Sequence, residues 1–202
     1  MKRMAALVFP GFQTLDYFGP IELLGGFRDE IEVVTVAMTP GPVESRHRQR
    51  IVVDRVCSPG DRYDILFVPG GDSALEAGKD EALLAWLREV AAGADSVMAV
   101  CTGTILLGLA GLLDGRRATT NKLDFTATVP LAPRVEWVKK ARWVKDGKFY
   151  TSSGVSAGLD MALAVAADMF GRAAADEMAE GSEYVWRDDP DWDPFAARAG
   201  LV

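Results

Sequence analysis

The sequence predicts an α/β protein in which a mainly parallel sheet is sandwiched by helices. Short buried apolar runs that suit strands alternate with longer segments of helical spacing. This is the order of a parallel sheet covered on both faces. Three strand ends also run into turn-forming or reactive residues, namely Phe9-Pro10-Gly11, Val68-Pro69-Gly70-Gly71 and Val100-Cys101. Ligands bind at the carboxyl ends of strands in such sheets, so we expect these ends to cluster.

The expected strands are apolar or β-branched runs bounded by turn residues. In chain order they cover residues 4–9, 31–38, 63–68, 96–100, 135–137, 141–145 and 148–151, with 117–120 as a short strand or turn. Asp146-Gly147 is a strong hairpin signal between the last two strands. Residues 43–45 and 51–54 flank a basic run and predict a peripheral hairpin.

The expected helices show apolar residues at spacings of three or four. They cover residues 12–27 (beginning near Asp16 or Pro20), a segment starting at Leu75, and then 80–92, 105–113, 123–128, 155–170 and 172–180. Asp80 suits an N-cap, and Asp114-Gly115 suits a helix stop. From about residue 184 the chain predicts an irregular tail that is rich in aromatic side chains.

Length and composition fit one soluble globular domain over residues 1–202. The chain is 49% hydrophobic and 25% charged, with a net charge of −7. The only dense basic run covers residues 46–50, which is unlike the broad basic footprint of a nucleic-acid binder. An acidic surface also offers little to an anionic membrane, and no stretch approaches the roughly 20 apolar residues of a membrane span.

Cysteine usage and the N-terminus predict a cytoplasmic protein. Two cysteines, Cys57 and Cys101, do not make a disulfide framework, and a reducing compartment suits free thiols. The first apolar run stops at Pro10-Gly11 without the small-residue cleavage site of a signal peptide. We expect Cys57 to be a structural thiol at a strand end.

Cys101 is placed between an expected strand and an expected helix. The turn at Thr102-Gly103 would leave the cysteine at a helix N-terminus, where unpaired N–H groups and the helix dipole favour a thiolate and can hold an anion. A packed core thiol is the alternative, since free cysteine is among the most buried residue types. The local sequence leaves both interpretations open.

Two further features belong to the same predicted edge of the sheet. Asp16 follows the first strand, where it could act as an acid or as a helix N-cap. Gly70 and Gly71 allow the backbone to come close to a ligand and point N–H groups into a pocket, although a plain strand-to-helix turn would use the same residues.

These features carry a resemblance to the ThiJ/PfpI superfamily, whose domain is related to the class I glutamine amidotransferases. The matching motifs are Asp16, Pro69-Gly70-Gly71, Ala99-Val100-Cys101-Thr102-Gly103, the segment 109–120 and the segment 151–160. The resemblance spans roughly residues 4–185. It implies a flavodoxin-like or Rossmann-like α/β fold, a nucleophile elbow at Cys101 and a homodimer.

Within the superfamily, Cys-Thr-Gly together with an aspartate after the first strand resembles the isocyanide hydratases. Such enzymes add water to an isocyanide, a small molecule, to give an N-substituted formamide without a metal or cofactor. The resemblance implies the following roles: Cys101 as nucleophile, Asp16 as proton shuttle, Thr102 beside the nucleophile, Gly70 and Gly71 as anion-stabilising donors, and Val155 near the cysteine strand. A charged Asp16 would oppose thiolate formation, so we expect the two groups to titrate as a coupled pair.

The position of the single histidine argues against hydrolysis by a cysteine–histidine pair. The only histidine is His47, in the basic run, whereas cysteine hydrolases need an imidazole within reach of the sulfur. Many relatives carry a histidine after the Ala-Thr-Thr stretch, where this chain has Asn121 followed by Lys122. We therefore expect addition to a polarised small molecule rather than amide or peptide hydrolysis.

Two alternatives stay open. One is glyoxalase-type aldehyde chemistry without a cofactor at the same cysteine, and another is a non-enzymatic sensor of oxidative stress. Relatives that are regulators fuse this domain to a helix-turn-helix module. We expect no such role here, since 202 residues leave no room for one.

Overall fold

The computed structural model describes all 202 residues and confirms the predicted α/β fold. Seven strands form one sheet in the order β10-β11-β7-β6-β1-β2-β5. The parallel strands are β1 (Lys2–Leu7), β2 (Ile31–Ala37), β5 (Arg55–Val56), β6 (Ile65–Val68), β7 (Ser96–Val100) and β11 (Phe149–Ser152). β10 (Trp143–Asp146) pairs antiparallel with β11 through the predicted hairpin at Asp146-Gly147.

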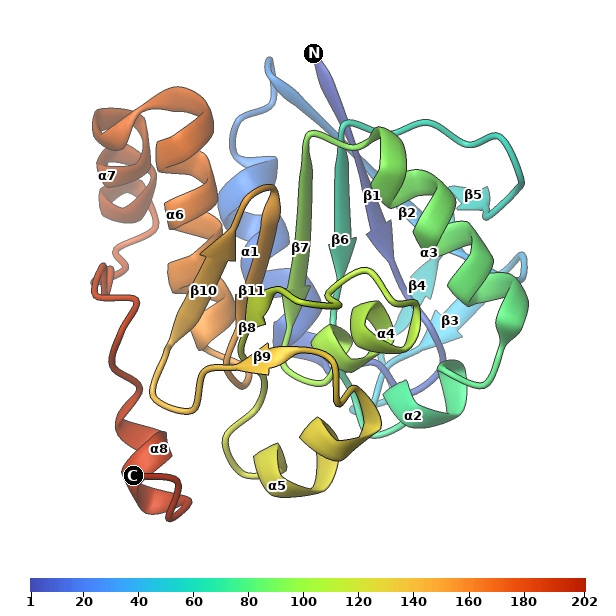
Figure 1. The fold of residues 1–202 in the computed structure, drawn as a ribbon. Helices are drawn as coiled ribbons and strands as arrows, with labels where there is room; N and C mark the ends of the chain where they lie inside the picture. The colour runs from blue at the N-terminus through green and yellow to red at the C-terminus, as the bar shows by residue number, and fades with distance from the viewer.

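Helices cover both faces of this sheet (Figure 1). One face carries α1 (Thr14–Gly25), α6 (Ala157–Phe170) and α7 (Arg172–Gly181), with α6 packed between the other two. The opposite face carries α2 (Ala74–Ala77), α3 (Glu81–Gly93) and α4 (Gly103–Leu109). Asp80 caps α3 as predicted, since its Oδ1 accepts hydrogen bonds from the backbone N–H groups of Ala82 and Leu83.

The central strands form the core and position the site. Every residue of β6 and β7 is buried, in keeping with strands covered on both faces. Their apolar residues belong to a single hydrophobic cluster of 50 buried residues. Because β1, β6 and β7 are parallel neighbours, their carboxyl ends meet at one edge, the lower edge in Figure 1.

Smaller elements differ in part from the prediction. β3 (Pro42–Glu44) and β4 (Arg50–Val52) form the expected peripheral hairpin. β8 (Arg117–Ala118) and β9 (Glu136–Trp137) form a separate parallel pair rather than joining the main sheet. α5 (Phe125–Thr128) and the 3-10 turn Val129–Leu131 lie between them in the chain.

The structure differs from the predicted helices at the start of α1, at the end of α4 and in the tail. α1 begins at Thr14, so Pro20 lies inside it and removes one intrahelical hydrogen bond. α4 ends at Leu109 rather than near residue 113, and Gly111 then takes a left-handed conformation that no longer continues a helix. The tail contains a helix that was not predicted, α8 (Pro194–Arg198), whose signal was the N-cap and first-turn pair Asp193-Pro194.

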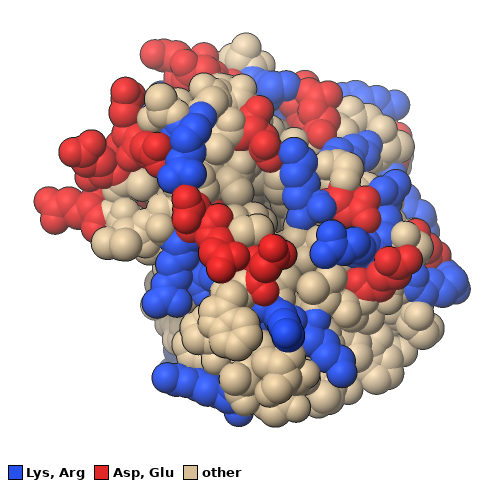
Figure 2. All heavy atoms as spheres, turned by 60° about the vertical axis from the view of Figure 1, so that its left-hand side comes forward, with Lys and Arg blue, Asp and Glu red and all other residues tan.

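The surface is mixed in charge. Figure 2 shows Lys and Arg side chains interspersed with Asp and Glu on the face that it displays, with a lower part that is largely uncharged. No helix has the length and the apolar character that a membrane span requires.

A buried ion pair ties the tail to the sheet. Arg142 Nε donates to Asp160 Oδ2 at 2.6 Å, and the two side chains are 5% and 0% exposed. Asp160 Oδ1 accepts from the Tyr184 hydroxyl and from the Arg187 backbone N–H. Both carboxylate oxygens are thus satisfied, as a buried charge requires.

We expect Arg142→Met to lower the free energy of unfolding by about 3–5 kcal/mol, because it leaves the Asp160 carboxylate buried without its cation. Urea denaturation measures this change. The matched control is Arg50→Met, which removes the exposed pair of Arg50 with Glu44 and should cost less than about 1 kcal/mol. Equal losses in the two variants would contradict the assignment of Arg142 as a structural anchor.

Candidate active site

Cys101 occupies a strained turn between β7 and α4. Its φ is 57°, a left-handed conformation that costs a non-glycine residue roughly 1–2 kcal/mol. The next helix starts within two residues because Gly103 has no side chain. A Cβ at Gly103 would lie 2.5 Å from the Val68 carbonyl oxygen. The turn places the sulfur at the strand-end edge while Cys101 remains only 5% exposed.

Asp16 lies in the first turn of α1, and its side chain leaves the helix for the cysteine. Gln13, not Asp16, stands at the N-cap position, so the capping alternative for Asp16 does not hold. The carboxylate is fully buried, and its Oδ2 accepts the Gly70 N–H at 3.1 Å. The neighbouring Cys101 thiol lowers the pKa of this carboxyl, as a hydrogen-bond donor does. Asp16 Oδ1 has no partner at all, which is costly for a buried polar atom.

The Gly70-Gly71 turn makes room for this contact. A Cβ at Gly70 would lie 2.7 Å from the Thr102 amide nitrogen and 2.8 Å from Asp16 Oδ2. A Cβ at Gly71 would lie 2.5 Å from the Gly11 carbonyl oxygen. The ends of β1, β6 and β7 can therefore come together only around glycine at these two positions.

The N–H groups of the two glycines already have partners within the protein. That of Gly70 binds Asp16, and that of Gly71 donates to Thr102 Oγ1 at 2.9 Å. The Thr102 hydroxyl in turn donates to the Gly71 carbonyl at 3.0 Å. In this structure the glycines and the Thr102 hydroxyl thus hold the turn together, and neither glycine presents a free donor to a bound anion.

The donors that face the sulfur come from other positions. Asn121 Nδ2 donates a hydrogen bond to the Cys101 sulfur at 3.2 Å, and the backbone N–H groups of Thr102 and Val155 are near enough to the sulfur to lower its pKa as donors. Val155 has a φ of 44°, so a second strained residue contributes its backbone here. Asn121 is held in place because its Oδ1 accepts the Leu123 N–H and its Nδ2 also donates to Asp124. From the sequence, Asn121 stood out only as a departure from the family pattern.

Burial shifts the acid–base behaviour of the pair. Desolvation raises the pKa of Asp16 to about 7, although the hydrogen bonds from Gly70 and Cys101 oppose the shift. Desolvation and the nearby Asp16 charge raise the pKa of Cys101 to about 12, while the three donors at the sulfur lower it. The Asp16 charge thus disfavours ionisation of the thiol, so above about pH 7 the pair holds a single proton, which these pKa values place mainly on the sulfur.

A cavity of about 50 Å³ opens over the sulfur. It is lined by Cys101, Thr102, Asn121 and Val155 together with polar side chains at its mouth. There Arg46, from the β3–β4 hairpin, forms an ion pair with Asp72 at 3.0 Å. A water molecule needs roughly 10–15 Å³, so the cavity holds a few small atoms only.

His47 is not among the residues that line this cavity. Its Nδ1 lies 2.9 Å from Thr14 Oγ1, at the start of α1. No group of three or more His, Cys, Asp or Glu side chains gathers to hold a metal ion. Cys57 follows the short edge strand β5 and is half-buried, and burial raises its pKa to about 12.

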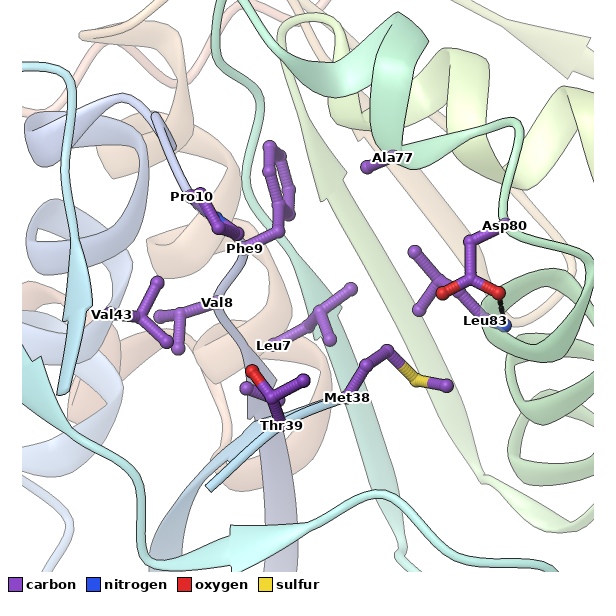
Figure 3. A pocket seen from close by; sticks show the side chains of 11 residues that line it. Leu7, Val8, Phe9, Pro10, Met38, Thr39, Val43, Ala77, Asp80 and Leu83 are labelled. Carbon is purple, nitrogen blue, oxygen red and sulfur yellow. Dashed lines mark hydrogen bonds between the residues drawn. The ribbon is translucent and has the colours of Figure 1, made fainter. Parts of the chain in front are cut away.

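A second cavity at the same end of the sheet is separate from the cysteine. It has about 220 Å³ and is mostly apolar, with Leu7, Val8 and Phe9 from the end of β1 facing Met38 and Leu83 (Figure 3). The Asp80 carboxylate at its rim is already engaged in capping α3, as the dashed line in Figure 3 shows. None of its lining residues is shared with the Cys101 cavity.

Comparison with known proteins now identifies the family. Residues 2–168 match the DJ-1/PfpI family. The chain belongs to this family. The resemblance seen in the sequence is therefore confirmed, and the strained cysteine between β7 and α4 is the elbow that this resemblance implied.

Individual relatives show the range of proteins that share the domain. An isonitrile hydratase of Pseudomonas putida is 35% identical over 171 residues, which cover 84% of this chain and 72% of the relative. The HTH-type transcriptional regulator CdhR of Pseudomonas aeruginosa is 29% identical over 86% of this chain but only 52% of its own length. A solved ThiJ/PfpI family protein from Pseudomonas syringae superposes with a TM-score of 0.84 at 30% identity, covering 99% of this chain and 84% of that one.

We expect the alkylation rate of Cys101 by iodoacetamide to rise through about pH 7 and then level off between pH 8 and 10. The reason is that loss of one proton from the pair creates a constant fraction of thiolate until the second proton leaves at much higher pH. Peptide mass spectrometry measures the rate.

Cys57 is an internal control for this measurement. The nearby Asp61 carboxylate and burial both raise the pKa of Cys57, and no acid with a raised pKa shares its proton, so its rate should increase about tenfold per pH unit throughout the range. Asp16→Asn should remove the plateau at Cys101. A Cys101 rate that follows the profile of Cys57 in the wild type would show that the two acids are not coupled.

Asp16→Asn should make the protein more stable at pH 8 by about 2–4 kcal/mol. The folded-state pKa of Asp16 lies near 7 against 3.8 for the ordinary carboxyl, so ionisation destabilises the fold increasingly as the pH rises from 4 to 7. Asparagine keeps an acceptor for Gly70 without the charge. Urea unfolding at pH 4 and pH 8 measures the effect, and the gain should nearly vanish at pH 4; a gain of equal size at both values would refute the ionisation cause.

Proposed function

We propose that the protein is an isocyanide hydratase-like enzyme that converts an isocyanide and water to an N-substituted formamide. The observation that carries the proposal is the Asp16–Cys101 pair, which holds one proton beside a sulfur with three hydrogen-bond donors. Similarity to the Pseudomonas putida isonitrile hydratase supports the same reaction.

The shape of the cavity favours this substrate class. An isocyanide presents a linear two-atom group whose terminal carbon is both electrophilic and able to accept a proton. The 50 Å³ cavity over Cys101 suits such a slender group better than a peptide or a glutamine side chain. The cavity lining also lacks the imidazole that cysteine hydrolases use, since His47 faces Thr14.

The first half of the reaction forms a covalent thioimidate. The shared proton first moves from the Cys101 thiol to Asp16. The Cys101 thiolate then attacks the terminal carbon and forms a C–S bond, while the protonated Asp16 gives its proton to the same carbon. This yields R–N=CH–S–Cys101 and leaves Asp16 as a carboxylate. The donors from Thr102, Val155 and Asn121 stabilise the thiolate before attack and when it leaves again.

The second half adds water and releases the product. Water attacks the thioimidate carbon, and Asp16 takes a proton from that water and passes it to the nitrogen. The tetrahedral R–NH–CH(OH)–S–Cys101 then loses the sulfur as thiolate while Asp16 accepts the hydroxyl proton. This releases R–NH–CHO and restores the pair with its single proton.

The homodimer and the cytoplasmic location stay predictions. Both belong to the same proposal, the first from the family resemblance and the second from the free thiols. Leu15 and Phe18 are exposed apolar side chains on α1 that fit a surface covered by a second copy.

The wild type should hydrate cyclohexyl isocyanide to N-cyclohexylformamide, with formation of the formamide followed by chromatography. Cys101→Ala should abolish turnover, and Asp16→Asn should reduce kcat by about 10²–10⁴-fold, since it cannot supply the proton. Cys57→Ala is the matched control and should retain full activity.

Two outcomes would count against the proposal. One is a wild type without isocyanide turnover, and the other is equal activity in Cys101→Ala. Methylglyoxal is tested in parallel, because its consumption without isocyanide hydration would favour the glyoxalase alternative.

A further inference from the structure

A third cavity, distinct from the 220 Å³ cavity of Figure 3, adjoins the one over Cys101. It has about 170 Å³ and shares Asn121 and Val155 with the smaller cavity, so the two meet along these residues. Most of the surface that faces it is apolar. The 220 Å³ cavity of Figure 3 is comparably apolar but has no lining residue in common with the Cys101 cavity. The 170 Å³ cavity therefore lies next to the cavity over the reactive sulfur, whereas the 220 Å³ cavity does not.

The apolar walls of this cavity come from distant parts of the chain. Leu123 follows Asn121 in the loop before α5, and Phe195 belongs to α8 in the tail. Phe195 is 41% exposed and Leu123 74% exposed, so neither is needed to fill the hydrophobic core. Ligand pockets are lined mainly by hydrophobic and aromatic side chains, so these two side chains suit the wall of a binding site.

The tail that carries Phe195 is firmly attached. The Pro190 carbonyl accepts the Arg142 N–H at 2.7 Å, and the Asp193 N–H donates to the Lys140 carbonyl at 2.7 Å. Asp193 Oδ1 also accepts the Phe195 N–H and so caps α8. These bonds hold the Phe195 ring at a defined position, which a specificity wall requires.

Lys122 lines the cavity without presenting a free charge to it. Its Nζ donates to Thr119 Oγ1 at 2.6 Å and lies 3.5 Å from the Thr120 carbonyl, and the residue is only 2% exposed. The ammonium group is thus satisfied within the protein, and the aliphatic stem is what remains for a ligand. The cavity suits an uncharged, apolar group.

We propose that this cavity binds the substituent on the isocyanide nitrogen, that it selects a six-membered ring such as cyclohexyl or phenyl, and that Phe195 determines this specificity. The inference rests on the proposed function. Cavities of about 150 Å³ bind benzene, so a volume of about 170 Å³ matches one ring. With the ring there, the terminal carbon extends past Asn121 and Val155 into the cavity over Cys101.

Phe195→Ala should raise KM for cyclohexyl isocyanide about tenfold and leave KM for methyl isocyanide unchanged, because only the ring contacts this wall. Leu123→Ser, an exposed substitution on another wall, should act in the same direction without risk to folding. The matched control is Trp192→Ala, a half-exposed aromatic in the same tail that does not line the cavity. Equal effects on both substrates, or none in either cavity variant, would overturn the inference.

A binding measurement separates this inference from the proposed reaction. Calorimetry on Cys101→Ala compares N-cyclohexylformamide with N-methylformamide, and only the former should lose affinity on addition of Phe195→Ala. If the wild type hydrates no isocyanide but this loss is seen, the reaction is wrong and the ring site stands. If isocyanides are hydrated but Phe195→Ala changes neither binding nor KM, the ring site is wrong and the reaction stands.

Discussion

The single proton shared by Asp16 and Cys101 is the constraint on which the site depends. Both groups are buried, and burial disfavours the charged form of each. Their proximity further disfavours two charges at once. Above about pH 7 the site therefore carries one negative charge, and the protein must supply hydrogen-bond donors to both groups that can hold it. Gly70 serves the carboxylate, while Thr102, Val155 and Asn121 serve the sulfur.

The backbone is distorted to deliver these donors. Cys101 and Val155 both adopt left-handed conformations that glycine would accept more easily, and a Cβ at Gly70 would collide with Thr102 and Asp16. Strain of this kind persists only where surrounding structure imposes it. Here the buried strands β6 and β7 and the Thr102–Gly71 hydrogen bonds impose it. The stability of the sheet is thus what allows a costly arrangement at its edge.

The proposed reactivity and the proposed selectivity come from different parts of the molecule. The elbow, Asp16 and the glycine turn lie at the carboxyl edge of the parallel sheet, within the residues 2–168 that match the DJ-1/PfpI family. The neighbouring cavity is instead walled by a loop and by the last helix of the tail. Loops and tails tolerate change more readily than a buried sheet does, so substrate choice can vary while the chemistry at sulfur stays constant.

The sequence by itself determined the alternation of strands and helices, the strand-end position of Cys101 and the glycine turn, because these follow from local apolar patterns and turn residues. It also singled out Asp16, Thr102 and Val155 through the family resemblance. Only the tertiary structure decided that Asp16 reaches the sulfur instead of capping α1, and that the N–H groups of Gly70 and Gly71 are already bonded. Only the tertiary structure, likewise, identified Asn121 as a hydrogen-bond donor to the sulfur and Phe195 as part of the cavity wall. These hydrogen bonds and cavity linings involve residues that are far apart in the chain. Local sequence patterns do not indicate which distant group will accept a hydrogen bond from a buried donor.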